Sequence, residues 1–244
     1  MIWGEVIIPR SEQKRFRLPA IDRICREGLT FDNFYANSCV CSPTRVALLT
    51  GYVPDRVGVP GVIATRNQSS ATRQPFFLYL AYNAPHDLIQ PPAEWIERVS
   101  KRQPGLSDKR VKLVARIEQM DAGIGKVLNK REELQLAGNT LVIFTSDHGG
   151  ILGHGAVNGP WRSEKQHMYE GGLRVPAMAR WPQRIAPGGH VAVTMDLFAS
   201  VVEAAEITPP TGIDEVSVLP TLLGQPQSDQ PRDRYFVRRE GGPA

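Results

Sequence analysis

The sequence is poor in cysteine, with only Cys25, Cys39 and Cys41 among its 244 residues. Three clustered thiols are too few to form a disulfide framework. No cysteines and histidines have the spacing of a structural zinc site either. We therefore expect that any metal ion in this protein takes oxygen ligands.

Long apolar runs and blocks of like charge are also missing. No apolar run approaches the roughly 20 residues that a transmembrane helix needs, so we expect no membrane partner. The first residues, Met1 to Glu5, lack the order of charged, apolar and small residues that marks a secretory signal, which leaves the compartment open. A net charge of +4, without basic residues interleaved with aromatics, argues against a nucleic-acid partner and suits small anionic substrates.

Apolar residues are plentiful enough to form a core. They make up 41% of the chain, which suffices for one large domain or one and a half. They recur at helical spacing in residues 18–25, in a long segment capped by Ser107, and from Asp196 onward. Continuous apolar runs predict three strands, at residues 75–82, 140–146 and 175–181. The first two are apolar enough to be buried on both faces.

Between Cys41 and Gly51, a small polar turn runs directly into an apolar helical segment. Pro43 suits the first turn of a helix and Ser42 is the expected cap, which puts Cys41 at the mouth of the helix. Backbone N–H groups and the positive end of the helix dipole favour an anion there, and Arg45 adds a permanent positive charge. The alternative is a buried cysteine beside a capped helix.

Four more polar residues follow predicted strands or lie in a glycine-rich loop. His86 follows the first strand, and Asp147 and His148 follow the second, at the edge where open α/β sheets bind ligands. A histidine can donate a proton near neutral pH, and carboxylate and imidazole groups are metal-ligand types. Lys165 lies in the loop that comes next. The alternative for each is an ordinary polar or solvent-facing loop residue.

The run Cys41-x-Pro43-x-Arg45, followed by Leu49-Thr50-Gly51, resembles the signature of the type I sulfatases, in which the cysteine is oxidised to formylglycine. Further motifs occur in the family's order, at residues 18–23, 28–31, 33–36 and 52–59 and from 75 nearly to the end. The resemblance implies an α/β fold of the alkaline-phosphatase-like type, a sandwich in which helices flank a mixed, mostly parallel sheet.

The resemblance also implies the chemistry. It implies a sulfuric ester hydrolase that cleaves a small-molecule or carbohydrate sulfate ester after a formylglycine-generating enzyme has modified Cys41. Residue 41, Asp147 and His148 are expected to bind a divalent metal, calcium or alternatively magnesium. The expected catalytic and sulfate-binding residues are Cys41, Arg45, His86 and Lys165. The cations stabilise transition-state charge, and His86 assists the leaving group.

Three parts of the family pattern are not found, so we expect the fold to be incomplete. They are a first strand with paired aspartates, a Lys-x-His motif after the signature, and a smaller C-terminal subdomain. We predict a sulfatase-type domain at residues 1–206 with a polar connector at 64–74, followed by a tail at 207–244 that begins a shortened subdomain. Fewer ligands should weaken metal binding, and a missing strand should expose an apolar face.

Two alternatives to a sulfate-ester hydrolase stay open. One is a non-catalytic relative that keeps an anion pocket, and the other is a phosphate-ester hydrolase of the same superfamily. The compartment also stays open, although full-length relatives are commonly periplasmic or secreted.

Overall fold

The structure is a computed structural model that describes residues 17–52, 76–86, 88–182, 184–185, 191–208, 210–214 and 216–225. The predicted connector at residues 64–74 lies outside these ranges. The helices and strands are α2 (Pro19–Arg26), β1 (Leu29–Thr30), β2 (Asn33–Tyr35), α3 (Cys41–Thr50), α4 (Ala93–Arg102), α5 (Asp108–Glu133), β3 (Val142–Thr145), α6 (Glu170–Leu173), β4 (Ala177–Arg180), β5 (Val191–Val193), α7 (Asp196–Ala204) and α8 (Leu219–Leu222). Two short 3-10 helices lie at Ala137–Asn139 and Leu152–His154.

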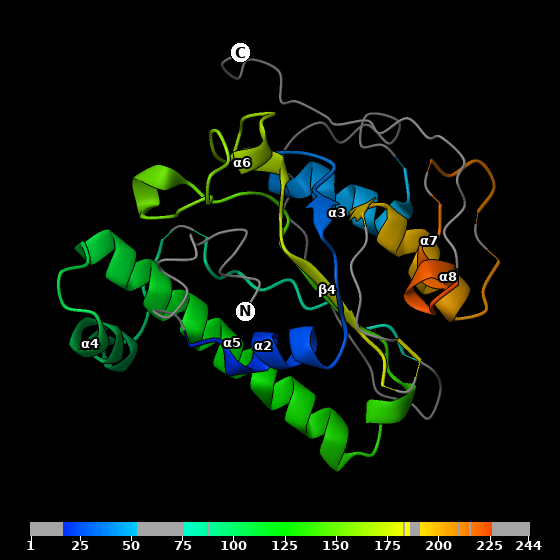
Figure 1. Ribbon diagram of the computed structural model, residues 1–244, viewed down its shortest axis with the longest axis horizontal. Helices are drawn as coiled ribbons and strands as arrows, with labels where there is room; N and C mark the ends of the chain where they lie inside the picture. The colour runs from blue at the N-terminus through cyan, green and yellow to red at the C-terminus, as the bar shows by residue number, and fades with distance from the viewer. Residues whose placement is uncertain are drawn as a thin grey trace.

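A three-stranded sheet with the order β1-β4-β3 separates two groups of helices (Figure 1). α2 and α5 pack together on one face, and α7 and α8 lie on the other. The side chains of β4 alternate between these faces. Met178 belongs to the core with α2 and α5, whereas Ala177 and Ala179 belong to the core with α7 and α8. The layered α/β arrangement is therefore confirmed.

The direction of the strands differs from the prediction. Two of the three strand pairings among the described residues are antiparallel, β1 with β4 and β3 with β4. Only β2 and β5 are parallel, with Phe34 opposite Ala192. The sheets are mixed, but the prediction of a mostly parallel sheet is wrong for these strands. Parallel neighbours need a crossover, usually a helix. Because the longest helix between β3 and β4 is α6, with four residues, the chain returns beside β3 in the opposite direction.

α3 begins earlier than predicted. Its first residue is Cys41 and its N-cap is Val40, so Ser42 lies inside the first turn and is not the cap. The turn before the helix is held by Ser38 and Thr44. The Ser38 N–H donates to Thr44 Oγ1 at 3.1 Å, and that hydroxyl donates to the Ser38 carbonyl at 2.8 Å. This local exchange fixes the entry into the helix, whereas the N-cap residue Val40 supplies no side-chain hydrogen bond.

α5 supports the face of the sheet formed by β3 and β4. Ser107 caps it as predicted, since its hydroxyl accepts from the Arg110 N–H at 3.4 Å. Asp121, on the buried side of α5, accepts from the N–H groups of Ala20 and Ile21 at 3.0 and 2.8 Å. The N-cap residue of α2 supplies no side-chain hydrogen bond of its own. A carboxylate from α5 therefore caps α2.

The apolar run at residues 75–82 is not a buried strand. Its described residues form no ladder, and Phe76, Phe77 and Leu78 are 57%, 66% and 47% exposed. Among residues 76–83, only Tyr79 is half-buried. Apolar strands are buried on both faces only where neighbouring elements cover them.

The described part of the predicted tail contributes α8 to the main core. Leu219 and Leu222 are buried in the same cluster as Leu197 of α7. The domain boundary at residue 206 stays a prediction. In the part of the chain that the structure describes, no helix is long and apolar enough to cross a membrane.

Candidate functional site

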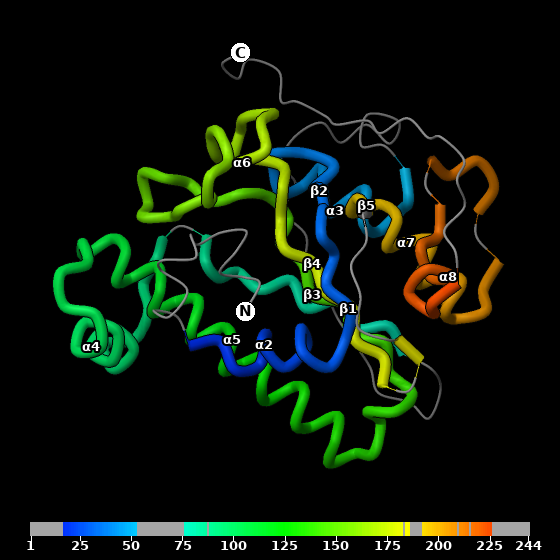
Figure 2. The backbone as a smooth tube through the Cα atoms, in the orientation of Figure 1, coloured from blue at the N-terminus to red at the C-terminus, as the bar shows by residue number. Residues whose placement is uncertain are grey.

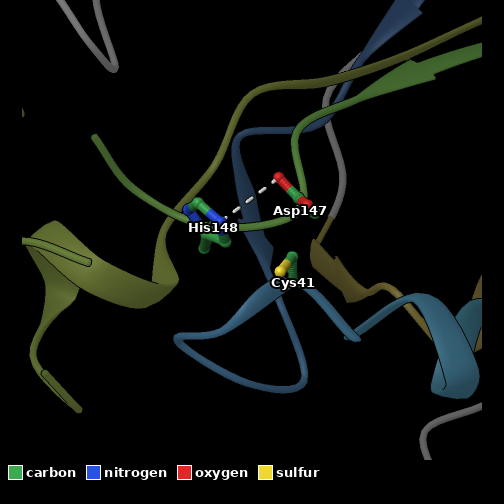
Figure 3. A group of neighbouring side chains, drawn as sticks. All are labelled: Cys41, Asp147 and His148. Atoms are coloured by element: carbon green, nitrogen blue, oxygen red, sulfur yellow. Dashed lines mark ion pairs between the residues drawn. The ribbon is translucent and has the colours of Figure 1, made fainter. Parts of the chain in front are cut away.

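The start of α3 and the loop after β3 meet at one end of the molecule (Figure 2). The Gln166 N–H donates to the Cys39 carbonyl at 3.1 Å, which joins the two segments. Cys41 lies in the first turn of α3, and Asp147 and His148 follow β3. A sulfur, a carboxylate oxygen and an imidazole nitrogen from these side chains lie within 4.8 Å of one another (Figure 3). The three predicted metal-binding residues are therefore neighbours.

Arg45, about one turn into α3, binds Asp147. Its Nε and Nη2 donate to Asp147 Oδ2 at 3.1 and 3.0 Å. Burial opposes the charged form of Arg45, but the carboxylate outweighs it and raises the pKa of the guanidinium. Burial also opposes ionisation of Asp147, but the neighbouring His148 and the positively charged Arg45, which donates to the carboxylate, outweigh it and lower the pKa of the carboxyl. Asp147 is thus an anion at neutral pH, with Oδ1 3.7 Å from His148 Nε2.

His148 is held in one tautomer by its own loop. Its Nδ1 lies 2.9 Å from the Gly149 carbonyl, which can only accept, so Nδ1 carries the proton and Nε2 a lone pair. Nε2 is buried and has no hydrogen-bond partner among the residues that the structure describes. Burial lowers the pKa of His148 against the opposing effect of Asp147, and the positive charge of Lys165 adds to the lowering. A neutral ring with a buried lone pair beside a carboxylate suits metal binding.

Lys165 and His86, both predicted to bind sulfate, form a pair beside this group. Lys165 Nζ lies 3.3 Å from His86 Nε2. Because an ammonium only donates, Nε2 accepts and the other ring nitrogen carries the proton. The Lys165 N–H donates to the Gly150 carbonyl at 3.2 Å, so the position of Lys165 depends on the loop after β3. The structure thus brings all six predicted site residues together, and their roles stay predictions.

Asn158 is a residue that the sequence analysis missed. It is buried, and its Nδ2 donates to the carbonyls of Gly150 and Ser163 at 3.0 and 3.1 Å. Its Oδ1 accepts from the Gly150 N–H at 3.0 Å. Asn158 therefore ties the loop after β3 to the segment just before Lys165. The signal in the sequence was the Asn158-Gly159 pair, which is typical of a turn and says nothing of its partners.

Gly149 lets the loop after β3 pack closely against α6. A Cβ atom at this position would lie 1.8 Å from the Gly171 carbonyl oxygen. The Gly149 N–H donates to the Gly172 carbonyl at 2.9 Å. The backbone beside His148 is therefore held directly by the backbone of α6.

Tyr79 is a second residue that the sequence analysis missed as part of the site. It interacts electrostatically with both Arg45 and Asp147. Burial raises the pKa of its phenol, so Tyr79 is a neutral group beside the ion pair. The sequence indicated only that it belonged to an apolar strand.

The donors at this site fit some divalent ions better than others. Calcium takes about six to eight oxygen ligands. Among the described residues, the cluster offers Asp147 Oδ1, because Arg45 binds Oδ2, together with one imidazole nitrogen and one sulfur. Calcium and magnesium, the ions that the resemblance implies, fit this set poorly, whereas nitrogen and sulfur suit a softer ion. Of the three donor atoms in this cluster, only that of Asp147 is the oxygen that we expected, and the ligand set stays a prediction.

Comparisons with known proteins give one consistent result. The family model for sulfatases matches residues 11–71 and 61–207. Human N-acetylgalactosamine-6-sulfatase is 37% identical over 170 residues, which cover 66% of this chain and 31% of that enzyme. Rat steryl-sulfatase is 42% identical over 127 residues, which cover 47% of this chain and 22% of that enzyme. The chain thus spans about a third or less of the length of these curated relatives.

Two solved structures share the fold. The crystal structure of Ps i-CgsB in complex with k-i-k-neocarrahexaose has a TM-score of 0.79 at 20% identity, and the match covers 87% of this chain and 72% of that chain. The structure of BT4656 in complex with its substrate D-glucosamine-2-N,6-O-disulfate has a TM-score of 0.63 at 17% identity, covering 92% and 80%. At such identities the likeness shows the fold alone, which is alkaline-phosphatase-like α/β.

Proposed function

We propose a function for this chain on the ground that it belongs to the sulfatase family. It is the core of a sulfuric ester hydrolase that acts through residue 41 after a formylglycine-generating enzyme has modified Cys41. The observation that carries the proposal is the position of Cys41, which begins α3 beside Asp147 with Arg45 about one turn away. The modification supplies two geminal hydroxyls, one to attack sulfur and one to expel sulfate as the aldehyde re-forms.

Positive charge around residue 41 supports binding of a sulfate ester. Arg45 comes from the same helix, and its two hydrogen bonds to Asp147 orient the guanidinium before a substrate arrives. Lys165 adds an ammonium, and the N-terminal end of α3 adds the positive end of a helix dipole. Donors oriented in advance toward transition-state charge lower the barrier by about 3–4 kcal/mol each. We assign this task to Arg45 and Lys165.

His86 is the group best suited to protonate the leaving oxygen, because an imidazole exchanges protons near neutral pH. Lys165 Nζ donates to His86 Nε2 at 3.3 Å and so orients the ring. When the Nδ1 proton passes to the leaving oxygen, Nε2 takes a proton from the Lys165 ammonium, so the ring stays neutral. Replacing Lys165 should therefore affect both sulfate binding and proton transfer.

We propose a sulfate ester carried by a carbohydrate as the substrate class. In support, the match to N-acetylgalactosamine-6-sulfatase covers 66% of this chain, compared with 47% for steryl-sulfatase. Trp161 lies in the loop that also carries Lys165, and Arg174, at the C-terminal end of α6, stacks over its ring, 4.2 Å from the centroid. Aromatic and cationic side chains of this kind suit a sulfated sugar better than an apolar sterol.

The test begins with the full chain produced together with a formylglycine-generating enzyme. Mass spectrometry of the peptide that contains Cys41 measures conversion of the thiol to the aldehyde. Hydrolysis of p-nitrophenyl sulfate and of p-nitrophenyl phosphate is then compared for the wild type, for Cys41→Ala and for Cys25→Ser. Cys25 is a matched control, since it is half-buried and its Sγ lies 3.3 Å from Thr30 Oγ1, away from the candidate site.

We expect conversion of Cys41, faster hydrolysis of the sulfate, and loss of this activity in Cys41→Ala but not in Cys25→Ser. An unmodified Cys41 in protein that binds sulfate without turnover would overturn the proposal in favour of a non-catalytic relative. Faster hydrolysis of the phosphate would overturn it in favour of a phosphate-ester hydrolase.

A further inference from the structure

We propose that the chain with unmodified Cys41 binds Zn²⁺ through Cys41 Sγ, Asp147 Oδ1 and His148 Nε2. The proposal concerns the thiol form of the protein, so it does not rest on sulfate-ester hydrolysis. It also replaces our expectation that a metal ion here takes oxygen ligands.

The separation of the three donors is close to that of a zinc site. One ligand atom from each residue lies within 4.8 Å of the other two, and Asp147 Oδ1 is 3.7 Å from His148 Nε2. Ligand atoms around tetrahedral zinc, with bonds of about 2.0–2.3 Å, are about 3.3–3.7 Å apart. Small rotations of the side chains would close the cluster around one ion.

Two of the donors are already oriented by neighbouring groups. The Gly149 carbonyl accepts from His148 Nδ1–H, which turns the lone pair of Nε2 toward Asp147. Within the described part of the chain this buried lone pair has no hydrogen-bond partner. Arg45 holds Asp147 Oδ2 and leaves Oδ1 on the side of His148. Metal-binding histidines and carboxylates are typically fixed by such outer contacts. The orphaned nitrogen is the observation that points most directly to a cation.

The chemistry of the donors favours zinc over calcium. Thiolate and imidazole ligands suit zinc, whereas calcium needs many oxygens. Arg45 also neutralises part of the charge of Asp147, which weakens a purely electrostatic site. Three protein ligands leave a fourth position for water or an anion.

Binding requires a change of protonation and no redox step. The Cys41 S–H bond breaks, its proton passes to solvent, and the thiolate forms the bond to zinc. His148 already presents a lone pair on Nε2, so it loses no proton. One proton is therefore released from the site for each ion bound.

The test uses cobalt(II) as a spectroscopic substitute for zinc, added without oxygen to the full chain made in cells that lack a formylglycine-generating enzyme. A thiolate bound to cobalt gives a charge-transfer absorption in the near ultraviolet, and four-coordinate cobalt gives strong visible bands. The variants are Cys41→Ser and His148→Ala, with Cys25→Ser and Cys39→Ser as controls for the other two thiols. Circular dichroism checks that each variant is folded.

We expect the thiolate band to saturate at one cobalt per chain, to disappear on adding zinc, and to withstand excess calcium. It should be absent in Cys41→Ser and present in both cysteine controls, and His148→Ala should weaken binding at least about tenfold. No band in the wild type, a band that persists in Cys41→Ser, or displacement of cobalt by calcium would overturn the proposal. If Cys41→Ser does not fold, unchanged affinity in His148→Ala overturns it instead.

Discussion

Asp121→Ala is the substitution whose effect on folding can be worked out most directly from the structure. Asp121 is 1% exposed, and its two carboxylate oxygens accept the N–H groups of Ala20 and Ile21 at 3.0 and 2.8 Å. Removing the carboxylate leaves both donors at the start of α2 without their partner. These residues are themselves buried, so water has poor access to them.

A buried donor that loses its acceptor costs about 1–3 kcal/mol, and loss of a helix cap costs about 0.5–2 kcal/mol. Two donors in one cap therefore predict a loss of about 2–4 kcal/mol in the free energy of unfolding. A matched control is Glu133→Gln on the same helix. Glu133 is 63% exposed and pairs with Lys130 on the surface, so its replacement should cost less than about 0.5 kcal/mol.

The measurement is urea unfolding of the wild type and both variants, followed by circular dichroism. Asp121→Ala should lower the midpoint with little change in slope, because the surface exposed on unfolding stays nearly the same. A midpoint no lower than that of Glu133→Gln would refute the reasoning. It would mean that α2 does not depend on α5 for its cap.

Three further outcomes are expected. Lys165→Ala should lower kcat/KM for p-nitrophenyl sulfate at least about 100-fold, whereas Lys126→Ala on the exposed side of α5 should not change it. Asn158→Ala, which removes three hydrogen bonds, should lower the unfolding free energy by about 2–3 kcal/mol, and the exposed Asn139→Ala should have no measurable effect. Burial raises the pKa of Asp121 in the folded protein, although its two backbone hydrogen bonds oppose the shift. The folded protein therefore holds this proton more tightly than the unfolded chain does. The resulting gain in unfolding free energy is complete below about pH 4 and is lost as pH rises through the folded pKa. The stability difference between the wild type and Asp121→Ala should therefore grow as pH falls from neutrality, and a constant difference would contradict this sign.

Elements with strong local signals could be predicted from the sequence. Ser107 and the apolar spacing after it predicted α5, and Asp196 marked the start of α7. The strand at residues 140–146 was found as β3 (Val142–Thr145), but its residues are half-buried, so the prediction that it is buried on both faces is wrong. The exposure of residues 76–83 could not be predicted, because composition shows that a run can be buried but not whether neighbouring strands are there to bury it.

The residues of the candidate site also fall into those that the sequence could predict and those that it could not. Cys41, Asp147 and Lys165 could be found because their motifs follow one another in a family order. Asn158 and Tyr79 could not, because their roles depend on which groups lie beside them in space: two backbone carbonyls for Asn158 and an ion pair for Tyr79. The capping of α2 by Asp121 of α5 could not be predicted for the same reason, since the residues that Asp121 binds lie about 100 residues earlier in the chain.

The two proposals for residue 41 are linked because they concern the same atom, the side-chain sulfur of Cys41. Zinc binding needs this sulfur, whereas the hydrolase needs it to be replaced by oxygen. As a thiol, Cys41 gives the cluster a soft donor beside His148 Nε2, which favours zinc. Conversion to formylglycine replaces that sulfur with oxygen and leaves His148 as the single nitrogen donor of the three. The preference should then shift toward harder ions, because oxygen ligands suit calcium and magnesium. The state of residue 41 would thus decide which metal Asp147 and His148 help to bind.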